Sequence, residues 1–243
     1  MLPDTGRPGV KTETMFTRPF VDRVDAGRQL AEQLGEYRHR DDVIVLALPR
    51  GGVPVGFEVA RTLAAPLDVL IVRKLGAPGQ PELALGAIAS GDIIVINEDL
   101  PSWLRRPPGF EAEVAAQRDE LRRRERAYRN DRPAPVIEGR TVILADDGAA
   151  TGSSMVAAVR AARQLGAREI VVALPVSSGS ACEKLRELAD RVVCILVPDS
   201  FFAVGQWYQR FPQTSDEEVR SLLALAAPGH DPPAQATSSQ RQR

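Results

Sequence analysis

Short aliphatic runs alternate with longer amphipathic stretches through most of the chain. Continuous apolar runs are typical of strands covered on both faces, and their alternation with helices indicates a parallel sheet built from strand-helix-strand units. The sequence therefore predicts an α/β fold, a parallel sheet flanked by helices. The predicted strands are residues 43–48, 67–72, 141–145, 169–174 and 192–197, and the predicted helices are about 25–37, 53–64, 110–130, 152–165 and 178–190.

One segment interrupts this alternation. Residues 85–96 form two short apolar runs around Ser90, Gly91 and Asp92, a pattern that predicts a β-hairpin. The hairpin follows residues 76–81, which are rich in glycine and proline and are expected to form a loop. Such a loop is either a flexible lid or a plain surface connection, and the sequence leaves both open.

The two ends differ from the rest of the chain. Residues 1–14 and 228–243 are polar and rich in proline and glycine or alanine, glutamine and serine, so we expect disordered tails. Residues 15–227 are long enough for one main domain with an appendage. Within it, residues 111–130 place acidic residues ahead of basic ones at helical spacing, which favours a solvated structural helix over an arginine stripe for nucleic acid.

The composition argues against several classes of protein. The 31 basic and 32 acidic residues give a net charge of -1, so nucleic acid and membranes are not expected partners and any anion site is local. Cys182 and Cys194 are expected to be core residues, and with only two histidines a structural zinc site is excluded. No apolar run reaches the roughly 18 to 20 residues of a membrane span, and no signal core is visible, so a cytoplasmic location is expected.

The clearest chemistry lies between Val142 and Ser154. An aliphatic strand ends at Asp146 and Asp147, and a turn of small residues then opens a helix. Ligands of parallel sheets bind at such strand ends, and the glycines and helix amides suit a phosphate. Adjacent carboxylates would repel that phosphate, so they should face hydroxyls or a divalent cation. A phosphorylated sugar offers both groups.

Other phosphate motifs fit less well. A Walker-type loop needs a lysine where Ser153 follows Gly152, and a dinucleotide fingerprint needs three spaced glycines after the first strand. A plain strand-to-helix turn with a hydroxyl cap would explain residues 151–154 but not the two acids.

This stretch resembles the ribose-diphosphate loop of type I phosphoribosyltransferases. The resemblance implies that Asp146 and Asp147 hold the 2′- and 3′-hydroxyls of the ribose, and bind Mg²⁺ directly or through water. It also implies that the following loop grips the 5′-phosphate; the loop residues are Gly148, Ala149, Ala150, Thr151, Gly152, Ser153 and Ser154.

Two further segments resemble the same family in the expected order. Residues 48–53 are similar to its diphosphate loop, which gives Arg50, Gly51 and Gly52 a binding role and makes the Pro49–Arg50 bond a candidate cis peptide. The Arg73-Lys74 pair is similar to the segment that reaches the diphosphate when the flexible loop closes. All these residues are thus expected to bind substrate, with Arg50, Arg73, Lys74 and the two acids as the catalytic set.

An aromatic-rich segment near the C-terminus is similar to the family's hood over the acceptor base. Phe201, Phe202, Trp207 and Tyr208 are candidates to stack on a planar acceptor, although ordinary packing is the alternative. The resemblance divides the domain into a core of about 40–197 and a hood from 15–39 and 198–227, and it points to a bacterial subgroup of predicted phosphoribosyltransferases.

The implied function is transfer of 5-phosphoribosyl from 5-phosphoribosyl-1-diphosphate to a nitrogenous base, with Mg²⁺ as cofactor and pyrophosphate as product. Members that use 6-oxopurines carry an aspartate where this chain has Ala150, which weakens that acceptor class, and Gly148 stands where an aliphatic residue is common. The acceptor stays unidentified. The alternatives are a non-catalytic binding regulator and a sugar-phosphate hydrolase, for which the motif offers no histidine base. A homodimer is expected by family analogy.

Overall fold

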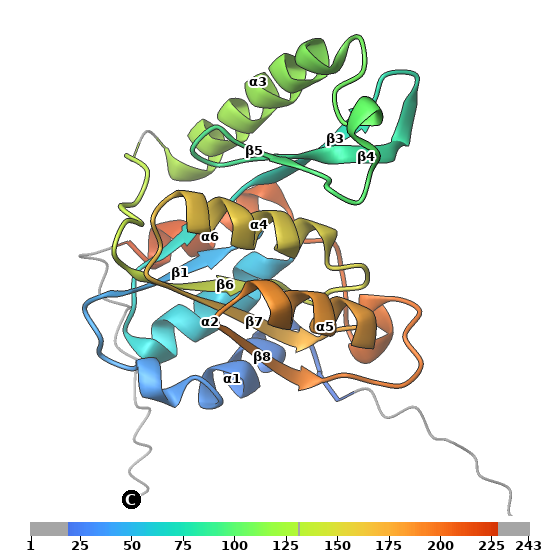
Figure 1. Cartoon of the computed structure of the whole chain (residues 1–243). Helices are drawn as coiled ribbons and strands as arrows, with labels where there is room; N and C mark the ends of the chain where they lie inside the picture. Colours follow the sequence, from blue (N-terminus) through green and yellow to red (C-terminus); the bar gives the residue numbers. More distant parts are fainter. Residues whose placement is uncertain (1–18, 131, 228–243) are drawn as a thin grey trace, which may run out of the picture.

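A five-stranded parallel sheet forms the centre of the protein (Figure 1). The computed structural model describes residues 19–130 and 132–227, so the tails predicted at 1–14 and 228–243 lie outside the described residues. All strand pairs in this sheet are parallel, as predicted. In sheet order the strands are β2 (Leu67–Val69), β1 (Val43–Ala47), β6 (Thr141–Ala145), β7 (Glu169–Val176) and β8 (Arg191–Leu196).

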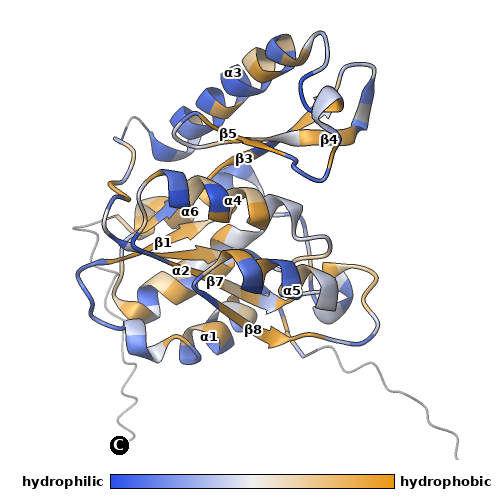
Figure 2. Cartoon of the chain, viewed as in Figure 1, coloured by the Kyte–Doolittle hydropathy of each residue, from blue (hydrophilic) through white to orange (hydrophobic). Residues whose placement is uncertain are grey.

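Helices cover both faces of the sheet because its strands are apolar on both sides. In β1, Val45 faces the cluster that includes helices α1 (Arg23–Glu32) and α2 (Gly52–Leu63). The next residue, Leu46, faces the cluster of α4 (Ser153–Gln164) and α5 (Gly179–Leu188). Figure 2 shows these strands as almost continuously hydrophobic and the helices as amphipathic.

A second, antiparallel sheet stands apart from the parallel one. It consists of β3 (Val72–Ala77), β4 (Gln80–Ala89) and β5 (Ile93–Ile96), and helix α3 (Phe110–Arg129) packs against it (Figure 1). The predicted hairpin is present, turning at residues 90–92. The prediction of a loop at 76–81 is wrong. Gly76 lies at a bulge in β3, and only residues 78 and 79 form the turn into β4.

Helix α6 (Asp216–Leu225) was not predicted from the sequence. Ser215 caps it by accepting a hydrogen bond from the Glu218 amide. Its buried side chains, Val219 and Leu223, belong to the same core cluster as α1 and α2. Three short 3₁₀ helices complete the described elements, at Gly35–Tyr37, Ser102–Leu104 and Val204–Trp207.

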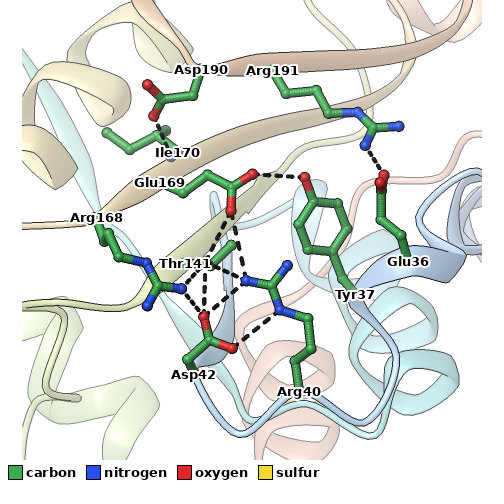
Figure 3. A network of polar contacts seen from close by, with 10 residues as sticks. All are labelled: Glu36, Tyr37, Arg40, Asp42, Thr141, Arg168, Glu169, Ile170, Asp190 and Arg191. Atoms are coloured by element: carbon green, nitrogen blue, oxygen red, sulfur yellow. Dashed lines mark hydrogen bonds and ion pairs between the residues drawn. The ribbon is translucent and has the colours of Figure 1, made fainter.

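A polar network ties together the amino ends of the parallel strands (Figure 3). Thr141, fully buried at the start of β6, donates to Asp42 at 3.0 Å. Tyr37 donates to Glu169 at the start of β7 at 2.9 Å, and Arg40 pairs with Asp42 at 2.9 Å. These charged groups satisfy one another at this edge of the sheet, and the proposed ligand groups lie at the opposite edge.

Candidate ribose-diphosphate site

The two predicted ligand loops meet at the carboxyl ends of β1 and β6, which are neighbours in the sheet. The approach of the loops requires glycine. A Cβ atom at Gly52 would lie 2.7 Å from the Ala145 carbonyl oxygen, and one at Gly51 would collide with the Asp147 carboxylate. The glycine pair therefore lets the diphosphate loop lie directly against the acidic loop.

The Pro49–Arg50 peptide bond in the diphosphate loop is cis, as predicted from the sequence. Helix α2 begins two residues later, at Gly52. Arg50 is partly exposed, and its guanidinium lies 3.7 Å from Asp216 at the start of α6. Arg50 is thus available at the end of the sheet where the two loops meet.

The two acids are held differently. Asp146 accepts the backbone N–H of Asp147 at 2.8 Å. The Asp147 carboxylate accepts a hydrogen bond from Arg23 at 2.8 Å, and its backbone carbonyl accepts the Tyr208 hydroxyl at 2.6 Å. The Arg23 guanidinium also donates to the Pro212 carbonyl at 2.6 Å, so two hydrogen bonds fix its position. Asp147 is therefore neutralised by a buried partner.

Burial and the neighbouring Asp147 carboxylate raise the pKa of Asp146 well above its ordinary value. Burial also raises the pKa of Asp147, whereas Arg23 opposes that rise. Two partly buried carboxylates beside one guanidinium leave an excess of negative charge, which a hydroxyl donor or a cation would offset.

The two carboxylates of the site can supply only part of the ligands that Mg²⁺ needs. Among residues 19–130 and 132–227, no group of three or more His, Cys, Asp or Glu side chains is arranged to hold a metal. Mg²⁺ commonly uses one or two carboxylates and takes its other ligands from water and substrate phosphates. Asp146 and Asp147 therefore fit a magnesium ion that arrives with a phosphorylated ligand.

The phosphate loop leads into the amino end of α4. Gly152, with φ +71°, precedes the helix and has no side chain to cap it. Thr151, Ser153 and Ser154 are exposed, and the first two lie 3.1 Å apart through their hydroxyl oxygens. An uncapped helix start with exposed hydroxyls suits an anion. Among the smaller loop residues, Ala149 is buried and Ala150 is exposed, with its carbonyl accepting from Ser178.

A cavity of about 350 Å³ opens beside this loop, between α4, α5 and the antiparallel sheet. Lys74 lines it together with Thr151, Ser153 and Ser154. Arg73 faces the other way and donates to Gln117 of α3 at 2.9 Å. Neighbouring residues of a strand point to opposite faces, so the structure brings Lys74 but not Arg73 into this cavity.

The predicted hood segments come together on the acidic loop. Phe20 forms a bridge with Tyr208, and both pack with Trp207 near the end of β7. Trp207 and Tyr208 are 8% and 1% exposed, so neither offers a free ring face to a planar acceptor. Phe201 is half-buried and Phe202 is 83% exposed. The observed contact of Tyr208 is its hydrogen bond to Asp147.

Sequence reasoning missed Arg23 and Asp216. Arg23 reaches Asp147 across 124 positions, and Asp216 begins a helix that was not predicted. Neither residue belongs to a local motif, so only the packing of distant segments identifies them. In the part of the chain that the structure describes, no helix is both long and apolar enough to cross a membrane.

A family model for the phosphoribosyl transferase domain matches residues 21–209, which include both loops, the antiparallel sheet and the hood aromatics. The chain belongs to this family. The resemblance noted at the acidic loop is thereby confirmed, and the parallel sheet with its flanking helices is the phosphoribosyl transferase core.

Two groups of relatives share nearly half of their residues with this chain over the matched region. Mycobacterium tuberculosis proteins, named provisionally as phosphoribosyl transferases, are 47% identical over 208 residues, covering 85% of this chain and 47% of theirs. The chain thus spans about half the length of the curated relatives it matches. The crystal structure of TT1426 from Thermus thermophilus is 47% identical with a TM-score of 0.75, covering 86% of this chain and 99% of that one.

Proposed function

We propose that the chain transfers the 5-phosphoribosyl group of 5-phosphoribosyl-1-diphosphate to a nitrogenous base and releases pyrophosphate. The observation that carries this proposal is the juxtaposition of the partly buried Asp146–Asp147 pair with the uncapped start of α4 on one side and the Arg50 loop on the other. Hydroxyls, a 5′-phosphate and a diphosphate are the groups that these three features suit.

Each part of the donor has a proposed ligand set. The ribose hydroxyls bind Asp146 and Asp147, and the 5′-phosphate binds the loop from Gly148 to Ser154. The diphosphate binds Pro49 to Gly52 and Arg73, whereas Lys74, expected to act with Arg73, faces the cavity beside the 5′-phosphate loop. Mg²⁺, held through Asp146 and Asp147, would supply additional positive charge to the diphosphate when bound.

The chemistry that this arrangement supports is a single displacement at C1 of the ribose. The base nitrogen forms the new bond, and the electron pair of the breaking C1–O bond leaves with pyrophosphate. Arg50 would stabilise the charge that develops on the leaving oxygen, and the carboxylates would hold the ribose in place. No protein nucleophile is required, and burial raises the pKa of the Cys194 thiol to about 12, which disfavours a thiolate.

Calorimetry tests the donor site. Wild type titrated with 5-phosphoribosyl-1-diphosphate and Mg²⁺ should bind, and an Asp146→Asn/Asp147→Asn variant should lose about 1.5 to 3 kcal/mol for each ribose hydrogen bond. Asp41→Asn is the control, because Asp41 is an exposed acid at the opposite edge of the sheet. Its affinity should equal that of wild type.

A screen of bases for pyrophosphate release then tests turnover. Release with one base class supports the transferase and names its acceptor. Tight donor binding without release for any base would favour a regulator that retains the pocket. A folded wild-type protein that does not bind the donor would overturn the proposal.

A further inference from the structure

Arg73 is a half-buried cation without a carboxylate partner. Within the described residues, no carboxylate lies within ion-pair distance of it, and its Nε donates to the neutral side-chain amide of Gln117. Burial and the neighbouring Arg124 lower the pKa of Arg73. Burying a guanidinium beside another one is unfavourable unless an anion joins them. Glu120 and Glu113 offset part of this effect, but neither carboxylate forms an ion pair with Arg73, so a negatively charged ligand would be stabilised there.

One face of α3 connects Arg73 with the diphosphate loop. Gln117, Leu121, Arg124 and Tyr128 recur at spacings of three and four residues, so they share that face. Gln117, at one end, binds Arg73. Tyr128, at the other end, donates to Asp216 at 2.6 Å, and the same carboxylate oxygen lies 3.7 Å from Arg50. Arg124 lies one helical turn from Tyr128 on this face, between the two ends.

At Arg124 the carboxylates along this face are outnumbered by guanidiniums. Glu120 is shared by Arg123 and Arg124, at 2.6 Å and 2.7 Å, so one carboxylate serves two guanidiniums. The two arginines also hold the pKa of Glu120 near 2. Arg124 is only about one-third exposed, so it is less screened than the outer arginines of α3.

We propose that Arg124 is a further ligand of the diphosphate group, and that Arg50, Arg73 and Arg124 act together as one arginine cluster. This inference rests on the proposed function and extends it to α3, where no motif places a ligand. Glu120 and Asp216 are the counter-ions of the cluster in the free protein, and the diphosphate replaces them as the partner of the guanidiniums.

Two small ligands distinguish binding at the arginine cluster from binding at the rest of the site. Inorganic pyrophosphate with Mg²⁺ reports on the arginine cluster, and ribose 5-phosphate reports on the acids and the phosphate loop. Arg124→Gln should weaken pyrophosphate binding about tenfold, the size of one charge-assisted hydrogen bond, and leave ribose 5-phosphate binding unchanged. Glu120→Gln should have the opposite effect and tighten pyrophosphate binding, because it frees Arg124 from its counter-ion.

Arg122→Gln is the matched control, since Arg122 is on the same helix, is 60% exposed and lies 3.9 Å from Asp92. It should change neither affinity by more than about twofold. Equal losses for both probes in Arg124→Gln would assign Arg124 a structural role and overturn the inference. If Arg50→Gln weakens pyrophosphate binding and Arg124→Gln does not, the inference fails and the proposed function stands. Wild type that binds neither probe would remove both proposals.

If Arg124→Gln does not fold, the Glu120→Gln variant decides alone. Unchanged or weaker pyrophosphate binding in that variant would overturn the inference.

Discussion

Gly52 and Gly179 occupy the same kind of position, the first residue of a helix after a parallel strand. They differ in what surrounds them. A Cβ at Gly52 would meet the Ala145 carbonyl and the backbone of Asp146, whereas nothing lies within 4 Å of a Cβ at Gly179. This pair of glycines separates the cost of a side chain at the loop contact from the general effect of alanine at a helix start.

Gly52→Ala should force the two ligand loops apart. We expect a loss of about 1 to 3 kcal/mol in the free energy of unfolding, as for overpacking elsewhere, and weaker binding of 5-phosphoribosyl-1-diphosphate. Gly179→Ala should lose neither stability nor affinity. Urea unfolding and calorimetry on both variants provide the test, and equal effects in the two variants would contradict the contact between the loops.

Single residues were predictable where a local motif carries them. Asp146 and Asp147 stand between a buried strand and a glycine-containing turn, and that order alone predicts a ligand site at the end of the sheet. Arg23 and Arg124 could not be found this way, because their positions depend on how α1 and α3 pack. The burial of Trp207 and Tyr208 likewise depends on Phe20, which is distant in sequence.

At the scale of elements, we expect the network at the amino ends of the strands to make the stability of the fold depend on pH (Figure 3). Burial and the hydrogen bond to Glu169 raise the pKa of Tyr37 from 10.0 to about 12. The folded state thus favours the neutral phenol. The stabilisation from this group is fully present below pH 10 and is lost as the pH rises from about 10 to about 12.

Tyr37→Phe should therefore lower the free energy of unfolding at pH 7 by about 1 kcal/mol, the usual value of one hydrogen bond. The difference from wild type should shrink at pH 11, because the unfolded wild-type phenol ionises there. Denaturant unfolding of both proteins at the two pH values measures this change. A difference that stays constant with pH would contradict the assigned role of Tyr37.

Strands with a continuous apolar pattern were mostly predicted well, but the run at 67–72 is divided between two sheets, because β2 ends at Val69 and β3 begins at Val72. Residues 141–145 were predicted as a strand and form β6 with the same bounds. The glycine and proline residues at 76–81 indicated a loop, yet they form a bulge and a tight turn inside a longer hairpin. Glycine and proline residues show where a strand can bend. Hydrogen bonding to a neighbouring strand determines whether the strand continues beyond the bend.

At the scale of the whole molecule, α6 belongs to the same core as the family domain although it lies beyond residues 21–209. Leu223 is fully buried there, whereas Leu225 is 45% exposed on the same helix. Leu223→Ala should lower the free energy of unfolding by about 2 to 5 kcal/mol, and Leu225→Ala by less than about 1 kcal/mol. Thermal or urea unfolding distinguishes them, and similar values would show that α6 does not contribute to the core.

The pairing of Phe20 with Tyr208 also determines the order in which the site is completed. Asp22 and Arg210, which join the same two segments, are 188 positions apart. During synthesis the segment around Phe20 leaves the ribosome long before its partner exists, and the parallel strands are made in between. Arg23 and Tyr208 both hold the Asp147 loop, so that loop reaches its final geometry only when the last of these residues has emerged. A nascent chain that stops short of Tyr208 therefore contains all five parallel strands but lacks one of the contacts that hold the acidic loop.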